Sequence, residues 1–219
     1  KKIYRATQFW PIHLAWTGMQ KKYNREFPFW PDVPVLLTSN INSQDAYNFT
    51  ASHQPDLVVV SGTSLVKEPL LSVPVGIGIM NLHTGLSPYI KGGPNCTNWC
   101  IAENKWHMIG NTIMWINAGI DTGNIITTEQ VDILNCRSLL DVQVKIMEEA
   151  HRLYCKAIGY VLTASAPYNS VPQNKIAEGR IYYTKMWTDE KKKQLLRNWR
   201  RKKNVVMEAA PQTVPLPNY

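Results

Sequence analysis

This 219-residue chain contains two short, predominantly apolar runs, each followed by polar residues. Residues 57–60 read Leu-Val-Val-Val and lead into Ser61 and Gly62, and residues 73–82 lead into His83. Such runs are typical of strands that are buried on both faces of a sheet. Helical patterns alternate with them along the chain. We therefore expect an α/β fold with a largely parallel sheet flanked by helices.

The other predicted elements follow from periodicity. Helices are expected over residues 45–53, 94–103 and 138–162, and strands over residues 108–116 and 124–131. The longest helix has apolar residues at spacings of three and four, namely Leu139, Val142, Ile146, Ala150, Leu153 and Ala157. Residues 1–45 show no sustained helical period, and their first strand-like run is residues 35–37, so we assign no helix to them.

The net charge of +8 comes from one segment near the C-terminus. Residues 191–203 hold eight basic residues and no acidic one, and the rest of the chain has equal numbers of basic and acidic residues. A helix from about residue 189 is predicted, with Leu195, Leu196 and Trp199 on one edge. We interpret it as a solvated helix whose apolar edge packs on the body. The alternative is a site for an anion, such as a nucleotide-sugar diphosphate, a tRNA backbone or a protein partner.

The four cysteines, Cys96, Cys100, Cys136 and Cys155, are too few and too irregularly spaced for a disulfide framework or a zinc site. We expect reduced thiols in a cytoplasmic protein, and no metal. No run approaches the roughly 18 apolar residues of a membrane span. Residues 1–5 also lack the apolar core of a signal peptide, so no membrane partner is expected.

Polar residues at strand ends are the first candidates for a site, because ligands of α/β sheets bind at the carboxyl ends of strands. Asn81 and His83 are two residues apart, so they would leave one face of a strand. Asp121 lies in a glycine-rich turn after another strand and could support His83. An amide that stabilises an oxyanion, an imidazole that exchanges a proton or adds charge, and a carboxylate suit acyl transfer. The alternative is that His83 is a core histidine and Asp121 merely forms a turn.

Three segments resemble the formyltransferases that use 10-formyltetrahydrofolate. The run NLHTGLSPYIKGGP (81–94) is similar to the first signature of that family, and GNTIMWINAGIDTGNII (110–126) is similar to the second. PDLVVVSGTSLVKEPLL (55–71) matches the preceding strand and loop. The resemblance covers roughly residues 45–165. It implies a Rossmann-like formyltransferase fold, with Asn81, His83 and Asp121 as catalytic residues.

The resemblance also implies where the cosubstrate 10-formyltetrahydrofolate binds. Its flat pteridine would lie between one loop and the backbone of one turn, where main-chain groups can read its edge. The loop consists of Thr63, Ser64, Leu65 and Val66, and the turn of Asn117, Ala118, Gly119 and Ile120. The alternative for Leu65 and Val66 is that they only pack in the core.

Two departures from the family pattern bear on the acceptor. The family's first strand and glycine-containing turn have no counterpart before Lys1, so we expect a catalytic domain over residues 1–165 that lacks its first strand, followed by an extension over 166–219. Residues 84–88 read Thr-Gly-Leu-Ser-Pro where many members have Ser-Leu-Leu-Pro after the histidine. The extension is too short for the RNA-gripping domain of tRNA formylases. We therefore favour a nucleotide-linked amino sugar over Met-tRNA, another nucleic acid, or glycinamide ribonucleotide.

Several other readings stay open. Asp121-Thr122-Gly123 is also the tripeptide of aspartic proteases, but a second copy is missing and only a homodimer could supply it. The chain has no G-x-G-x-x-G pattern, so a classical dinucleotide site is not expected. A formyltetrahydrofolate hydrolase and a non-catalytic, anion-binding relative remain alternatives to the transferase.

Overall fold

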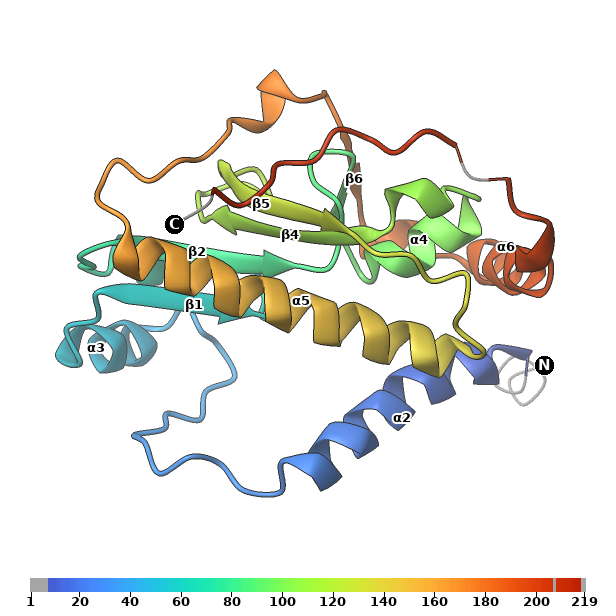
Figure 1. Ribbon diagram of the computed structural model, residues 1–219. Helices are drawn as coiled ribbons and strands as arrows, with labels where there is room; N and C mark the ends of the chain where they lie inside the picture. The colour runs from blue at the N-terminus through green and yellow to red at the C-terminus, as the bar shows by residue number, and fades with distance from the viewer. Residues whose placement is uncertain (1–7, 207, 218–219) are drawn as a thin grey trace.

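The computed structural model describes residues 8–206 and 208–217 (Figure 1). Residues 1–5, for which the sequence predicts no signal peptide, lie outside these ranges. The described chain is built around a four-stranded sheet, with one long helix, α5, lying across a face of that sheet. The carboxyl end of its strand β2 is where the candidate site forms.

The sheet has the strand order β1, β2, β4, β5. These strands are Leu57–Ser61, Gly78–His83, Gly110–Trp115 and Ile125–Gln130. β1 and β2 pair in parallel, whereas β2 pairs with β4, and β4 with β5, in antiparallel directions. The sheet is therefore mixed, and the expectation of a largely parallel sheet is wrong.

The antiparallel pairs follow from how the strands are connected. The loop from β4 to β5 contains no helix in the structure, and a parallel return needs a crossover of about a dozen or more residues. Between β2 and β4 the chain forms β3 (Ile90–Gly92) and α4 (Cys96–Ala102). It then re-enters the sheet where it left, with Thr112 of β4 opposite His83 of β2. The turn at residues 117–119 was predicted, but its effect on strand direction was not.

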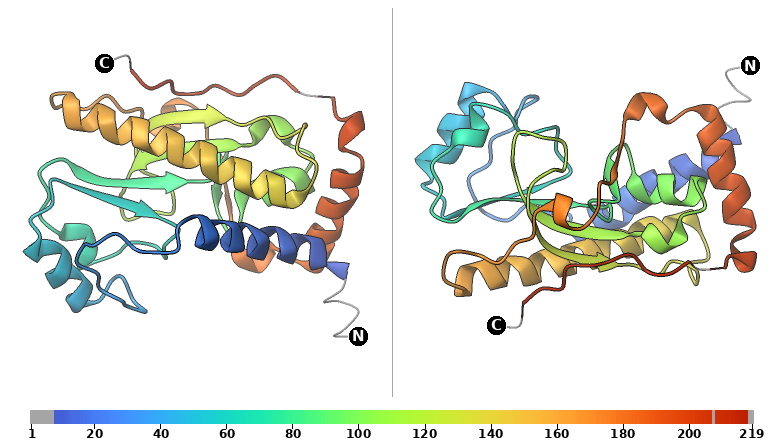
Figure 2. Two further views of the ribbon diagram at one scale, coloured as in Figure 1. Left: turned by 60° about the horizontal axis from the view of Figure 1, so that its bottom comes forward. Right: turned by 90° about the horizontal axis from the view of Figure 1, so that it is seen from above.

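The long helix α5, Leu139–Thr163, confirms the prediction over residues 138–162. Ser138 and Asp141 form a reciprocal capping box at its start, which satisfies backbone N–H groups that the helix leaves unpaired. Its predicted apolar stripe is buried, and Ala150, Leu153 and Ala157 pack against Met80 and Leu82 of β2. The stripe therefore covers one face of the sheet (Figure 2).

A helix that we did not predict, α2, covers Trp10–Glu26. It runs along α5, where Lys22 Nζ lies 3.0 Å from a carboxylate oxygen of Glu148 (Figure 2). Only Ala15 and Met19 are buried, while Trp10, Leu14 and Trp16 are exposed, so the sequence carries no clear stripe. The strand-like run at residues 35–37 is an irregular loop.

The predicted helices over residues 45–53 and 94–103 are confirmed, the first shifted by one residue and the second shorter than predicted. α3 covers Gln44–Ser52, and the side chain of Ser43 accepts a hydrogen bond from the backbone of Ala46 at its start. Asn95 caps α4 in the same way, accepting from the backbone N–H of Asn98. Short polar side chains at these positions are favoured because they pair otherwise free N–H groups.

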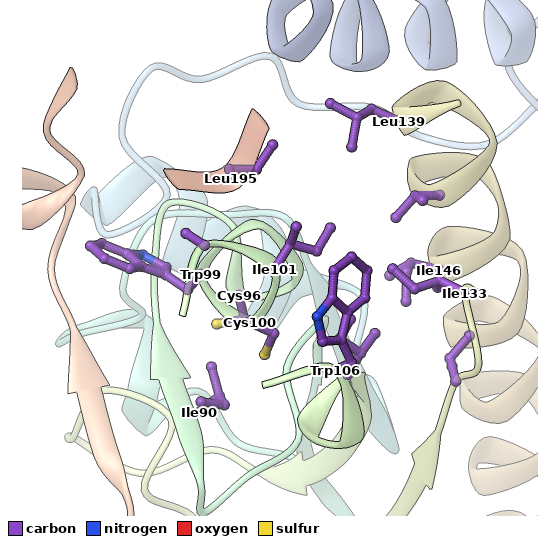
Figure 3. Close-up of a cluster of buried hydrophobic side chains, with 14 of the residues drawn as sticks. Ile90, Cys96, Trp99, Cys100, Ile101, Trp106, Ile133, Leu139, Ile146 and Leu195 are labelled. Atoms are coloured by element: carbon purple, nitrogen blue, oxygen red, sulfur yellow. The ribbon is translucent and has the colours of Figure 1, made fainter. Parts of the chain in front are cut away.

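The chain after residue 165 packs onto the same body. β6 (Arg180–Tyr182) pairs in parallel with β3, and α6 (Asp189–Arg200) packs on α4. Leu195 of α6 is buried in a cluster with Trp99, Ile101 and Trp106 (Figure 3). Leu196 belongs to the same cluster. The predicted apolar edge of this helix is therefore a packed surface. The proposed division of the chain at residue 165 stays a prediction.

Several basic side chains of the C-terminal segment have structural partners. Lys191 Nζ lies 3.1 Å from a carboxylate oxygen of Glu103, and Lys202 donates to the backbone carbonyls of Leu134 and Cys136. Arg197 pairs with Glu190 at 3.2 Å. These contacts favour the structural interpretation of the basic segment.

Over the described residues, every helix is too short or too polar to cross a membrane.

Candidate functional site

The site begins at the carboxyl end of β2, where Asn81 and His83 project from the same face of the strand. Side chains alternate along a strand, and Met80 and Leu82 occupy the face that packs against α5. Asn81 and His83 therefore point to the other side, as the sequence predicted. Asn81 lies opposite Val60 of β1 and Met114 of β4, so the neighbouring strands hold it in register.

The loop between β4 and β5 carries Asp121 to these residues. Within the loop, the side-chain oxygen of Asn117 accepts hydrogen bonds from the backbone of Gly119 at 3.0 Å and from Thr122 Oγ1 at 2.7 Å. Gly123 passes so close to the carbonyl of Trp115 that a Cβ there would overlap it. The loop is therefore closed tightly by local contacts.

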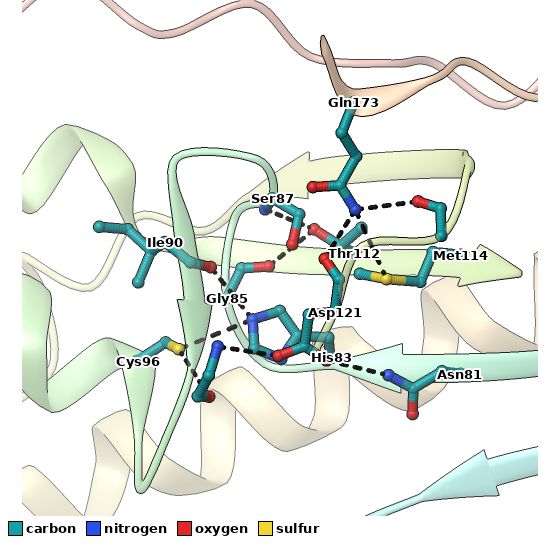
Figure 4. Close-up of polar contacts among 12 residues, drawn as sticks. Asn81, His83, Gly85, Ser87, Ile90, Cys96, Thr112, Met114, Asp121 and Gln173 are labelled. Carbon is teal, nitrogen blue, oxygen red and sulfur yellow. Dashed lines mark hydrogen bonds and ion pairs between the residues drawn. The ribbon is translucent and has the colours of Figure 1, made fainter. Parts of the chain in front are cut away.

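The carboxylate of Asp121 lies between the two β2 side chains (Figure 4). Its Oδ1 is 3.4 Å from Nδ2 of Asn81, and its Oδ2 is 3.4 Å from Nδ1 of His83. The backbone N–H of Gly92 donates to Oδ2 at 2.8 Å. The structure thus brings together all three residues that the sequence singled out for acyl transfer.

His83 is buried, with a polar or charged group facing each ring nitrogen. Its Nε2 lies 3.1 Å from the carbonyl oxygen of Ile90 and 3.6 Å from Sγ of Cys96, while Nδ1 faces Asp121. A Cβ at Gly85 would overlap Nε2, so this position leaves room for the ring. Burial by itself disfavours the charged imidazole, but Cys96, Asp121 and the Ile90 carbonyl together raise the pKa of His83 to about 9.

Cys96 is a contact that the sequence analysis missed. Its thiol is buried. Burial raises the pKa of the thiol, and the neighbouring imidazole of His83 opposes that rise. The irregular cysteine spacing contained no sign of this proximity, because the contact arises where the start of α4 meets the end of β2. Among the described residues, no group of three or more acidic, histidine or cysteine side chains is placed to hold a metal ion.

Asn81, His83 and Asp121 line a cavity of about 460 Å³ that opens between β1, β2 and the loop after β4. Most of the residues predicted for the cosubstrate line it: Thr63, Ser64, Leu65, Val66, Asn117, Gly119 and Ile120. Ala118 is the exception and lies off the wall. Trp16 of α2 and Met147 of α5 also line the cavity, and the sequence analysis missed both. Trp16 was missed because α2 was not predicted.

Gln173 is a further residue that sequence reasoning missed. It begins the short helix η3, Gln173–Lys175, and its amide nitrogen lies 2.7 Å from the backbone carbonyl oxygen of Asp121. It belongs to the segment after residue 165, where the resemblance to the family had ended. A pairing of Val171 with Ile125 of β5 brings this segment to the loop.

The chain matches known proteins along most of this region. The family profile described as Formyl transferase matches residues 17–158. The methionyl-tRNA formyltransferase of Bacillus thuringiensis subsp. konkukian (strain 97-27) is 30% identical over 128 residues, which are 58% of this chain and 40% of that protein. This chain therefore spans less than half the length of that relative.

Two solved structures share the fold over most of both chains. A sugar N-formyltransferase from Shewanella sp FDAARGOS_354 superposes with a TM-score of 0.58 at 18% identity, covering 86% of this chain and 83% of that one. Protein Rv3404c from Mycobacterium tuberculosis superposes with a TM-score of 0.57 at 16% identity, covering 94% and 95%. The family profile matches well over half of the described sequence, and its range includes Asn81, His83 and Asp121. The chain therefore belongs to the formyl transferase family.

Proposed function

We propose that this protein transfers a formyl group from 10-formyltetrahydrofolate to an amine, and that the amine belongs to a nucleotide-linked amino sugar. The observation that carries the proposal is the position of the Asp121 carboxylate, 3.4 Å from both Asn81 and His83 at the wall of one cavity. An amide donor, an imidazole and a carboxylate meet there without a nucleophile of their own. This set suits transfer between two bound molecules.

The cavity suits a folate in size and in chemistry. Its volume of about 460 Å³ lies within the range of small-molecule sites, which is roughly 300 to 1,000 Å³. Leu65, Val66 and Ile116 supply apolar walls, and the loop at residues 117–120 supplies backbone groups that can read the edge of a flat heterocycle. When bound, the folate supplies the formyl carbon that the acceptor amine attacks.

The environment of His83 indicates how it acts. Nδ1 faces the Asp121 carboxylate at 3.4 Å, and Nε2 lies 3.1 Å from the Ile90 carbonyl oxygen. Oxygen atoms that carry negative charge therefore flank both sides of the ring, which favours its protonated form. With its pKa raised to about 9, the ring carries a positive charge near pH 7. Of the two roles that the sequence left open, we therefore favour the fixed charge over proton exchange.

The other two residues complete the proposed chemistry. The Nδ2 group of Asn81 is a neutral donor beside the charged ring of His83, so both can stabilise negative charge that develops on the formyl oxygen. Asp121 holds the imidazolium in place, and its carboxylate is the acceptor in the site for a proton that the attacking amine must lose.

The acceptor class is supported by the extent of the structural matches. The Shewanella protein, a sugar N-formyltransferase, aligns over more than four fifths of both chains. The match to the Bacillus methionyl-tRNA formyltransferase covers 40% of that protein. The C-terminal segment of this chain is used for packing, through Leu195 and the ion pair of Lys191 with Glu103. A cytoplasmic location, expected from the thiols, stays a prediction.

The test is to incubate the full chain with 10-formyltetrahydrofolate and one acceptor at a time. The panel contains UDP- and dTDP-linked 3-amino and 4-amino sugars, methionyl-tRNA, glycinamide ribonucleotide and buffer alone. Mass spectrometry identifies the formylated product, and absorbance follows the release of tetrahydrofolate. We expect product with an amino sugar. Product with another acceptor would overturn the acceptor class, and equal release in buffer alone would indicate a hydrolase.

Two site variants and a matched control connect the activity to this site. Asn81→Ala and His83→Ala should each lower turnover by about 100-fold or more, as expected for loss of an oxyanion donor. His107 is also buried but lies outside the cavity, so His107→Gln should retain turnover. Near-normal turnover in a correctly folded Asn81 or His83 variant would refute the assignment.

A further inference from the structure

We propose that Gln173 is a positioning residue: its side-chain amide holds the turn at Asp121 and thereby keeps that carboxylate between Asn81 and His83. The consequence for turnover rests on the function proposed above, whereas the consequence for the charge of His83 does not. The proposal adds to the site a residue from the C-terminal segment, outside both signatures that carry the family resemblance.

The amide nitrogen of Gln173 bridges two backbone carbonyls of the loop. Nε2 lies 2.7 Å from the carbonyl oxygen of Asp121 and 2.9 Å from that of Gly123 (Figure 4). Because both partners are acceptors, only the NH2 end of the side chain can face them. One buried side chain therefore holds the backbone on both sides of Thr122.

The backbone at Asp121 needs such support. Its φ of +49° lies in the left-handed region, which Asp adopts more readily than most residues but which still carries a cost for a residue with a Cβ. The carboxylate has one hydrogen bond to the backbone, from Gly92, and two longer contacts of 3.4 Å to Asn81 and His83. Contacts of that length do not fix the turn by themselves. The bridge from Gln173 acts directly on the strained residue.

The other end of the Gln173 side chain argues against a role in packing alone. Its Oε1 is buried and has no hydrogen-bond partner in the described structure. An unpaired buried acceptor is destabilising, and an apolar side chain of similar size would fill the same space without that cost. The gain that offsets the cost is the pair of bonds from Nε2.

The chain also delivers Gln173 to the turn through a specific pairing. Val171 and Ile125 exchange two backbone hydrogen bonds, of 2.7 and 2.8 Å, just after the loop that carries Asp121. Pro172 then precedes the short helix in which Gln173 is the first residue. The backbone just before Gln173 is thus fixed to β5, which holds this residue beside the turn at Asp121.

The protonation of His83 provides a readout that is independent of catalysis. The groups that face its ring are the Asp121 carboxylate, the Cys96 thiol and the Ile90 carbonyl. Of these, only the carboxylate lies in the turn that Gln173 holds. A displaced carboxylate lowers the pKa of His83, because the imidazolium loses its opposite charge. A loss of stability without movement of the turn leaves that pKa unchanged.

The test titrates His83 by NMR of histidine ring carbons in the full-length protein, with the resonance assigned by its loss in a His83→Asn variant. In Gln173→Met, which keeps the volume but removes the donors, we expect the pKa of His83 to fall by about one unit, within the range for loss of a nearby charge. The matched control is Asn111→Leu. Asn111 is also a buried amide that donates to one carbonyl, that of Ile146, and has an unpaired oxygen, but it does not touch the turn. This control should destabilise the protein without changing the pKa of His83.

Each outcome decides the proposal. An unchanged pKa of His83 in folded Gln173→Met would overturn it, even if the variant melts at a lower temperature. Should that variant not fold, Gln173→Asn replaces it, since an amide shorter by one methylene cannot reach both carbonyls. In the transfer assay, the Met variant should lose about tenfold or more in kcat with little change in KM for 10-formyltetrahydrofolate. If the wild type formylates no acceptor, the proposed function fails, while the titration still decides the role of Gln173.

Discussion

Nδ1 of His83 lies 3.4 Å from Oδ2 of Asp121, a contact that joins the end of β2 to the loop between β4 and β5. The contact depends on the antiparallel pairing of β2 with β4, since this pairing determines where the loop begins. The Ile90 carbonyl and Cys96 surround the other side of the ring. The charge of His83 is therefore determined by three separate segments of the chain.

Replacing Asp121 with Asn should lower the pKa of His83 from about 9, because an amide does not stabilise an imidazolium as a carboxylate does. The group is charged below its pKa, so wild-type activity that needs the charge falls only as the pH rises through about 9. In Asp121→Asn the same fall should occur at a lower pH. A pH profile of kcat/KM checks this shift.

The control for that profile is Asp45→Asn, in the first turn of α3 and away from the cavity. It should reproduce the wild-type profile. A lower rate in Asp121→Asn with an unshifted profile would mean that Asp121 acts on the substrates and not through His83.

Acid should destabilise the protein partly through Glu103. Burial alone would raise the pKa of this carboxyl, but hydrogen bonds from Tyr182, Lys105 and Lys191 lower it to about 2. Its stabilising effect is therefore complete above the ordinary value of 4.5 and is lost as the pH falls toward 2. The free energies of urea unfolding of the wild type and of Glu103→Gln should converge as the pH falls from about 5 to about 2.

The exposed carboxyl of Glu26 offers the comparison for Glu103. Glu26→Gln should keep the acid sensitivity of the wild type. Parallel curves for wild type and Glu103→Gln across the same pH range would contradict a role for Glu103 in acid unfolding.

Replacing Leu195 with Ala should cost about 2 to 5 kcal/mol of unfolding free energy, the usual range for a buried leucine. Leu195 is 0% exposed, in the cluster that joins α6 to α4. Leu162, at 58% exposed, is the matched control, and its change to Ala should cost less than about 0.5 kcal/mol. Denaturant titration measures both, and equal losses would show that α6 does not contribute to the core.

Neutralising Arg197, Arg200 and Arg201 with Gln should leave the acceptor KM and its salt dependence unchanged. Arg197 forms an exposed ion pair with Glu190, and such pairs contribute only about 0 to 1 kcal/mol. The measurement is KM for the amino-sugar acceptor at low and high salt. A salt-sensitive KM that disappears in the triple variant would instead show that the basic segment attracts the acceptor's diphosphate.

Much of the local structure could be predicted from local pattern. The apolar stripe predicted α5, and the run at residues 57–60 predicted β1. The alternation of side chains placed Asn81 and His83 on one face. Helix α2 could not be predicted in this way, because it buries only Ala15 and Met19 and its contacts with α5 lie far along the chain.

The sequence pattern was enough to single out Asn81, His83 and Asp121 as the candidate side chains, since each lies at or after the end of an apolar run within a recognisable signature. Only the tertiary structure decided the strand directions, the Cys96 and Ile90 partners of His83, and the contact of Gln173 with the Asp121 turn. The two sets of features differ in how far apart along the chain the interacting residues lie. Periodicity and capping depend on residues a few positions apart, whereas the charge of His83 and the conformation of Asp121 depend on groups that meet only when the whole sheet has formed.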